Sequence, residues 1–322
     1  FESDVSAMLD VLAVYLAIRM GRSGHSRLAD AVFCGAALGA ALTVDYLNAL
    51  LVPIVSVFLM YSFRKSLSAF AKAFAGFIAA AALGVLLLAL YNQAAFGDPF
   101  LTTEQAYQQT SSLFGAFSYP ILDGLYLDLL SPLRGVFVFC PILVLGAIGF
   151  YFVPKRREFE NEAVLLAACF VGILIPYAMW YNPVGGEAFG QRFLVPVIPF
   201  LLLPSGFLME SRRRGVAAVA YLLYGVGVVF NGIAGVTTAI PQQEAVSHFP
   251  FLTQVLPLFL KGQLDTWWWR EAGPDWWAPS LVMIAVALAL PWATTRFLRS
   301  RDPSEADRTP DGGSDERNRL KQ

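Results

Sequence analysis

Apolar residues in this chain gather into long runs separated by polar stretches. Many runs approach the roughly 20 residues that an α-helix needs to cross the hydrocarbon core of a membrane. The runs expected to span are residues 5–18, 28–63, 69–90, 135–153, 163–179, 193–209, 216–236 and 280–295. The run 28–63 is interrupted at Asp45-Tyr46 and is just long enough for a hairpin of two short spans. The pattern predicts an all-α polytopic transmembrane helical protein with about nine spans.

Composition agrees with this class. The chain of 322 residues is 57% hydrophobic and only 15% charged, against roughly 25% charged residues in soluble domains. The formal net charge of −1 gives no reason to expect a nucleic-acid partner. Its three cysteines all fall inside apolar runs, where they are expected to be small buried side chains. The two histidines stand alone, so the sequence predicts no metal site.

Basic residues cluster at every second turn between the expected spans. The clusters lie at residues 19–27, 64–65, 155–157, 212–214 and 296–301. Because cytoplasmic loops are enriched in Lys and Arg, all these turns are expected on the cytoplasmic side of the cell membrane. Phe1 and the long loops are then extracytoplasmic, and the C-terminus is cytoplasmic. We expect a transmembrane domain over residues 1–298 and a disordered cytoplasmic tail over 299–322.

Two long loops are expected on the extracytoplasmic side, at residues 92–131 and 237–277. The second loop holds a tryptophan cluster at 267–269 and 276–277. Tryptophan rings favour the membrane–water interface, so this loop is expected to form an aromatic belt or an amphipathic helix on the outer leaflet.

The most informative stretch joins two apolar runs at residues 180–192. Its three glycines allow tight turns or close approach to a ligand. Glu187, Gln191 and Arg192 lie there at the edge of an apolar segment, where charges are costly unless they are paired or face water. An interfacial loop with one snorkelling arginine is the competing interpretation.

A second arginine occupies an equivalent place. Arg134 opens the run 135–153 from the outside, as Arg192 opens 193–209. The planar guanidinium group is a bidentate phosphate ligand, so this pair is predicted to bind phosphate, with Gln191 beside it. Other polar residues expected at the outer ends of spans are Tyr46, Asn92, Glu104 and Tyr107. No nucleotide-binding loop or nucleophile elbow is present, so an ATP-driven pump is not predicted.

These residues belong to motifs with a recognisable order. The motifs are Tyr91-Asn92 with Phe96-Gly97-Asp98-Pro99, then Leu130-Ser-Pro-Leu-Arg134-Gly135 with Pro141, then Gly185-Gly186-Glu-Ala-Phe189-Gly190-Gln-Arg192 with Pro196 and Pro199. Over roughly residues 1–210 the set resembles the membrane part of GT-C-type glycosyltransferases. These enzymes, of the protein O-mannosyltransferase and aminoarabinose-transferase type, use polyprenyl-phosphate sugars.

The resemblance implies inverting transfer of a sugar from a lipid-phosphate donor to a lipid, glycan or protein acceptor. The reaction takes place at the extracytoplasmic face, in a cavity between helices and loops, and needs no cofactor besides the donor substrate. Arg134 and Arg192 would hold the donor phosphate, and Tyr46, Asn92, Glu104 and Tyr107 would line the substrate cavity. The carboxylates available to deprotonate the acceptor are Asp4, Asp45 and Glu187. Asp10 lies deeper and is equally consistent with a polar contact between helices.

Two other classes remain open at this stage. A transporter or lipid flippase would place broken helices and polar residues near the membrane midplane, whereas here they concentrate at outer ends. A structural subunit of a membrane complex would lack activity altogether. The family carries its catalytic carboxylate in a first extracytoplasmic loop, and Phe1 leads almost directly into a span. We therefore expect an N-terminally truncated member whose natural chain begins upstream, with a non-catalytic relative of the family as the alternative.

Overall fold

The structure is a computed structural model that describes residues 2–23, 27–106, 113–152, 157–184, 189–209, 214–237, 249–263, 282, 285–290 and 293. Helices are its regular elements, and no strand occurs in these ranges. Among the described residues, three helices are long and apolar enough to cross a membrane. They are α4 (Leu67–Phe96), α9 (Glu160–Ala178) and α12 (Arg214–Thr237). The all-α class is thereby confirmed, and the total of about nine spans stays a prediction.

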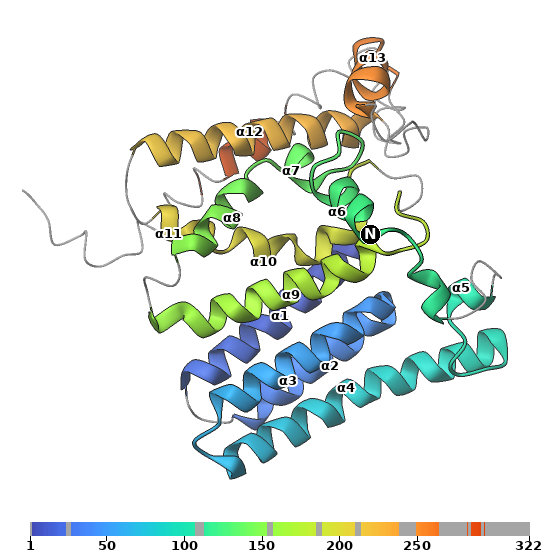
Figure 1. Cartoon of the computed structure of the whole chain (residues 1–322), viewed down its shortest axis with the longest axis vertical. Coiled ribbons are helices and arrows are strands. Elements are labelled where there is room, and N and C mark those ends of the chain that lie inside the picture. The colour runs from blue at the N-terminus through green and yellow to red at the C-terminus, as the bar shows by residue number, and fades with distance from the viewer. Residues whose placement is uncertain are drawn as a thin grey trace, which may run out of the picture.

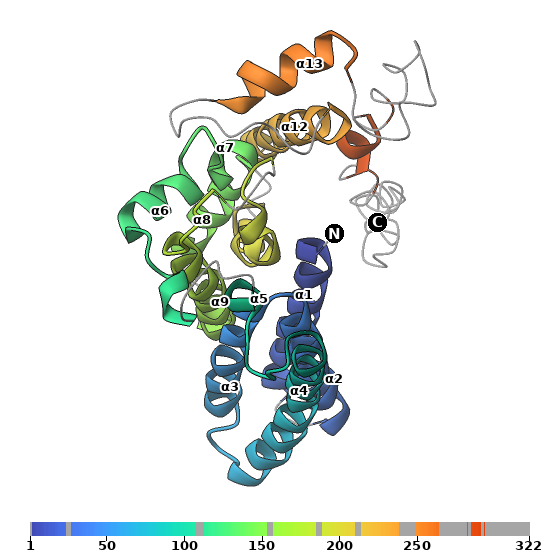
Figure 2. The same cartoon turned by 90° about the vertical axis from the view of Figure 1, so that its right-hand side faces the viewer.

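The first half of the chain forms a helical bundle. It consists of α1 (Glu2–Ser23), α2 (Leu28–Val44), α3 (Leu51–Ser62) and α4, with α9 packed against α3. Figure 1 shows these helices side by side, and Figure 2 shows α12 and α13 at the opposite side of the molecule from α3 and α4. The large fully buried side chains of this half include Met20, Leu38 and Phe77. Their burial supplies the apolar contact that holds the helices together.

The helices α2 and α4 approach each other at glycine. A Cβ atom on Gly35 would lie 2.0 Å from the backbone oxygen of Phe77, and one on Gly84 would lie 2.2 Å from the backbone oxygen of Gly39. Gly35 and Gly39 are four residues apart, so both face the same partner helix. Small residues at such spacing let two helix backbones pack closely. In lipid the hydrophobic effect does not drive helices together, so this close van der Waals packing is what favours their association.

The interruption predicted at Asp45-Tyr46 is confirmed. Asp45 has extended backbone angles, with φ −147° and ψ 122°, and ends α2. The next residues form a short 3-10 helix, η1 (Tyr46–Leu50), whose first turn is capped by Asp45. The Leu47 N–H donates to Asp45 Oδ1 at 2.9 Å. This carboxylate thus satisfies a backbone donor that would otherwise lack a partner.

Two runs expected as single spans are broken. Residues 135–153 divide into α7 (Val136–Phe139) and α8 (Leu143–Phe152) around Pro141. Residues 193–209 divide into η5 (Arg192–Val197), α10 (Ile198–Leu202) and α11 (Ser205–Met209). Three prolines punctuate this second run, at positions 196, 199 and 204. Proline removes a backbone hydrogen-bond donor and clashes with the preceding helical turn, so it interrupts a helix. A prediction based on apolar runs alone therefore missed these helix ends.

The expected loops contain helices as well. Residues 92–131 include the end of α4, α5 (Thr103–Ala106), η2 (Leu113–Ala116) and α6 (Ile121–Leu129). Residues 249–263 include a π-helical turn, η6 (Phe251–Val255), followed by α13 (Leu256–Leu260). Phe251 and Val255 pack against Ile233 and Ala234 of α12. The segment 251–260 is therefore a packed helix rather than a loop.

A short 3-10 turn, η4 (Arg157–Phe159), precedes α9.

Several predictions fall outside the described residues. They are the tryptophan cluster at 267–269 and 276–277, most of the run 280–295 and the tail 299–322.

Two ion pairs lie at one end of the bundle, which we call the basic end. Arg19 at the end of α1 pairs with Asp30 at the start of α2, at 3.2 Å. Arg22 pairs with Glu162 at the start of α9, at 2.8 Å, and lies over the ring of Phe159. The opposite end, which we call the α6 end, holds the N-terminus of α1, α5 and α6 (Figure 1). The basic clusters at residues 19–27 and 64–65 both lie at the basic end, and the side of the membrane that this end faces stays a prediction.

Labelling at the two ends of α4 tests the orientation. Its 30 residues extend about 45 Å, more than the roughly 30 Å hydrocarbon core. Leu67 and Phe100 flank this helix and are 80% and 84% exposed. We expect Phe100→Cys to react with an impermeant maleimide on intact cells and Leu67→Cys to react only after permeabilisation. The reverse pattern would place the basic end outside and contradict the predicted topology.

Candidate functional site

A cluster of aromatic and polar side chains forms where α2, α9 and η5 meet at the α6 end. The hydroxyl of Tyr177, near the end of α9, donates to the second oxygen of Asp45. The Tyr177 ring stacks on Phe193 with centroids 4.6 Å apart and planes 5° apart. Arg192 in turn lies over Phe193, at 5.2 Å from the ring centre. The stack connects a carboxylate to a guanidinium group through two aromatic rings.

The two candidate arginines lie within range of each other's charge. Arg134 lies between α6 and α7 and is only 2% exposed, whereas Arg192 is exposed. Burial, and to a smaller extent the positive charge of Arg192, lower the pKa of Arg134 to about 10. Each effect disfavours a second positive charge at this place. An anion beside both guanidinium groups would be attracted by their positive charges.

Gly135, the residue after Arg134, has no room for a side chain. A Cβ atom there would lie 2.6 Å from the backbone nitrogen of Ser131. The Ser131 hydroxyl accepts a hydrogen bond from the Leu133 N–H at 3.0 Å. The turn over residues 131–135 is thus closed on itself, and this tight turn fixes the backbone that carries Arg134.

Gln191 is held by a residue that the sequence did not bring to notice. Its side-chain N–H donates to Asp128 Oδ1, on α6. Gln191 is 6% exposed and Asp128 is 1% exposed. Gly190, just before Gln191, has a φ of 72°, which favours glycine. The loop that presents Arg192 is therefore anchored to α6 through the adjacent Gln191.

Burial changes the acidity of Asp128. It raises the pKa of this carboxyl from 3.8 to about 7, and the hydrogen bond from Gln191 lowers it in part. Asp128 Oδ2 and Gln191 Oε1 are both buried, and neither has a hydrogen-bond partner among the described residues. A protonated Asp128 has an O–H that can donate to the Gln191 oxygen. Protonation would therefore satisfy two buried acceptors at once.

The residues predicted to line a cavity lie at the same end but make different contacts. The Tyr46 hydroxyl lies 3.3 Å from the Thr103 hydroxyl of α5. Asn92 is 3% exposed, and its amide donates to the Pro99 oxygen at 3.4 Å. The segment between Asn92 and Pro99 contains the turn that Gly97-Asp98-Pro99 predicts. Gly97 has a φ of 79°, and the Asp98 side chain accepts a hydrogen bond from the Phe100 N–H. Asn92 thus ties the end of α4 to this turn.

Acidic residues of α1 occupy two environments. Asp4 is exposed in the first turn, whereas Asp10 is fully buried. Ser6 donates to Asp10 Oδ2 at 3.3 Å, and the Asn48 amide donates to the Ser6 hydroxyl at 2.6 Å. Asp10 therefore belongs to a polar contact between α1 and η1, which agrees with the non-catalytic interpretation.

Some predicted site residues are not placed. Glu187 and Tyr107 lie outside the described residues, and Glu104 is described only as part of the α5 backbone. Within the described ranges, no group of three or more His, Cys, Asp or Glu side chains is arranged to hold a metal ion.

Asp128 and Tyr177 are the residues that sequence analysis missed. Asp128 interrupts an apolar helix just before the Arg134 motif, and Tyr177 stands three residues before Trp180. Each places one polar group on an apolar segment, and a polar group buried there is expected to have a hydrogen-bond partner. The partner itself comes from a distant part of the chain.

The fold and site define an all-helical protein with membrane-type helices and a buried and an exposed arginine at one end of its bundle. No protein-family profile, curated protein or solved structure matches this chain significantly.

Proposed function

We propose that this chain transfers a sugar from a polyprenyl-phosphate donor to an acceptor at the extracytoplasmic face of the cell membrane. The observation that carries the proposal is that Arg134 and Arg192 lie near enough for their positive charges to interact. Arginine pairs suit phosphate because each guanidinium presents a planar fork of donors. The motif order shared with GT-C-type glycosyltransferases supplies the reaction type.

The reaction requires that the negative charge on the departing phosphate be stabilised and that the acceptor lose a proton. An acceptor hydroxyl or amine attacks the anomeric carbon, the bond from that carbon to the phosphate oxygen breaks, and polyprenyl phosphate leaves. Arg134 and Arg192 stabilise the charge on the departing phosphate. A carboxylate takes the proton from the acceptor. Asp4, Asp45 and Glu187 are the candidates for this base, and Asp45 lies in the cluster with Tyr177 and Phe193.

Conservative substitution of the arginines tests the phosphate site. A snorkelling arginine needs only a long stem and a positive charge, so Arg192→Lys would then bind donor normally. A bidentate ligand does not tolerate lysine, and loss of one charge-assisted contact costs about 1.5–3 kcal/mol, or roughly ten- to more than a hundredfold in affinity. We expect Arg134→Lys and Arg192→Lys to weaken binding of a fluorescent polyprenyl phosphomannose by this factor.

The matched control is Arg27→Lys, because Arg27 is exposed and precedes α2 at the basic end. Melting temperatures of all variants show whether the buried Arg134 position still folds. Unchanged donor affinity in folded Arg134→Lys and Arg192→Lys proteins would refute the phosphate site.

A further inference from the structure

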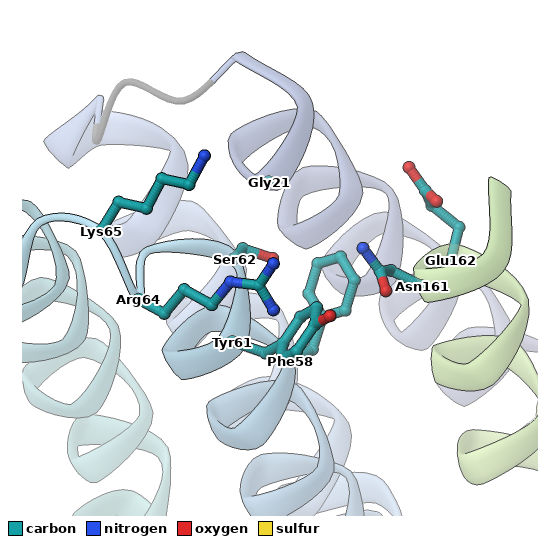
Figure 3. Close-up of a pocket in the computed structure, with 8 residues that line it drawn as sticks. All are labelled: Gly21, Phe58, Tyr61, Ser62, Arg64, Lys65, Asn161 and Glu162. Carbon is teal, nitrogen blue, oxygen red and sulfur yellow. The ribbon is translucent and has the colours of Figure 1, made fainter. Parts of the chain in front are cut away.

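A pocket of about 250 Å³ lies at the basic end, far from the arginine pair. Its lining residues come from α1, α3, the α3–α4 turn and α9: Gly21, Phe58, Tyr61, Ser62, Arg64, Lys65, Asn161 and Glu162. Figure 3 shows Arg64 reaching toward the gap between α3 and α9, with Asn161 and Glu162 on the opposite wall. The pocket is polar and open at one side.

The charge of this pocket is positive. Glu162 is already paired with Arg22 at 2.8 Å. Arg64 and Lys65 are exposed, and in the described part of the chain neither forms an ion pair. The guanidinium of Arg64 instead lies 4.2 Å from the centre of the Tyr61 ring. That stacking holds the group in place while its N–H donors remain available to an anion.

An apolar groove of about 560 Å³ continues from the same place along α3 and α9. It shares Phe58, Tyr61 and Asn161 with the polar pocket. Its other lining residues are Pro53, Ile54, Val57, Val164, Leu165 and Ala168. Val57 and Val164 are 59% and 64% exposed, so the groove is open to the surroundings of the bundle. Polar pocket and apolar groove therefore form one continuous surface.

From this continuity we infer that an anionic glycerophospholipid binds between α3 and α9, with its phosphate on Arg64 and Lys65 and one acyl chain along the apolar groove. A soluble anion would use the two cations but leave the groove uncovered. A neutral lipid would fill the groove but leave the cations without a counter-charge. Basic pockets beside membrane helices are suited to anionic head groups on the cytoplasmic side. The inference rests on membrane insertion and not on sugar transfer.

Lipid titration of the purified, delipidated protein by native mass spectrometry tests the site. The probes are phosphatidylglycerol and phosphatidylcholine with the same acyl chains. We expect phosphatidylglycerol to bind about tenfold or more tightly, because two cations near a membrane surface contribute by roughly that factor. The double variant Arg64→Gln with Lys65→Gln should remove this preference. The control Arg27→Gln with Lys72→Gln makes the same change in charge outside the pocket and should retain it.

A second pair of variants tests the acyl-chain groove. Val164→Trp should fill the groove and weaken both lipids, whereas Leu86→Trp on the exposed face of α4 should weaken neither. Equal affinity for the two lipids in the wild-type protein, or a preference that survives loss of Arg64 and Lys65, would overturn the inference. So would displacement of phosphatidylglycerol by an equal concentration of glycerol 3-phosphate, which would mark a soluble-anion site. Donor binding at Arg192 should be unchanged in all these variants, so the two proposals fail separately.

Discussion

Replacing Gly84 by valine is expected to force α2 and α4 apart. A Cβ atom there would meet the backbone oxygen of Gly39 at 2.2 Å, and a helix backbone cannot rotate away as a side chain can. Overpacking typically costs about 1–3 kcal/mol, and we expect the upper part of this range or more because the obstacle is backbone. Thermal unfolding in detergent, followed by size-exclusion chromatography of the surviving protein, measures the loss.

Ala82→Val is the matched control for this experiment. Ala82 lies on the same helix but is exposed, so the added methyl groups meet no neighbouring backbone. Its melting temperature should stay close to that of the wild type. If Gly84→Val and Ala82→Val melt together, close contact between α2 and α4 does not limit stability.

Replacing Asp128 by asparagine is expected to stabilise the protein at high pH. Because burial raises the pKa of Asp128 from 3.8 to about 7, the folded state binds more protons than the unfolded state between these values. Stability from this group is thus full below about pH 4 and declines as pH rises to about 7, by at most about 1.4 kcal/mol per unit. Asparagine presents an N–H donor to the Gln191 oxygen at every pH, whereas the acid presents an O–H donor only when it is protonated.

Chemical denaturation of both proteins from pH 5 to pH 8 checks this expectation. The wild type should lose stability relative to Asp128→Asn as pH rises, and the two should converge toward acid. At pH 8 the variant should be more stable by roughly 1–3 kcal/mol, the usual cost of an unsatisfied buried polar group. Asp123→Asn on the exposed face of α6 should leave the wild-type pH dependence intact. Parallel curves for wild type and Asp128→Asn would show that Asp128 is ionised in both states.

Hydrophobic pattern predicted the long helices well. Residues 69–90 and 216–236 lie within α4 and α12, and all of 163–179 but its last residue lies within α9, because an uninterrupted apolar run has few alternatives to a helix. The interruption at Asp45 was also predictable, since a charge within an apolar run marks a break. The runs 135–153 and 193–209 were expected to be continuous, and their prolines show why composition alone does not locate helix ends.

Part of the candidate site was predictable from local sequence and part was not. Glycine and proline beside Arg134 and Arg192 marked both as residues at the ends of spans. The depth of Arg134, the pairing of Gln191 with Asp128 and the stack from Tyr177 to Arg192 depend on contacts between distant segments. Such contacts are set by how helices pack, and a single sequence does not encode them in its periodicity.

The proline-broken segments also constrain how the protein enters a membrane. In lipid, a backbone group without an internal partner costs several kcal/mol, so pieces as short as α10 and α11 cannot stand in the bilayer as independent spans. They pack against α8, and Gly146 and Gly149 admit the backbone oxygens of Leu201 and Pro204. If these segments lie in the bilayer, they can enter it only after they have packed against α8, which precedes them in the chain, so partitioning must follow assembly here.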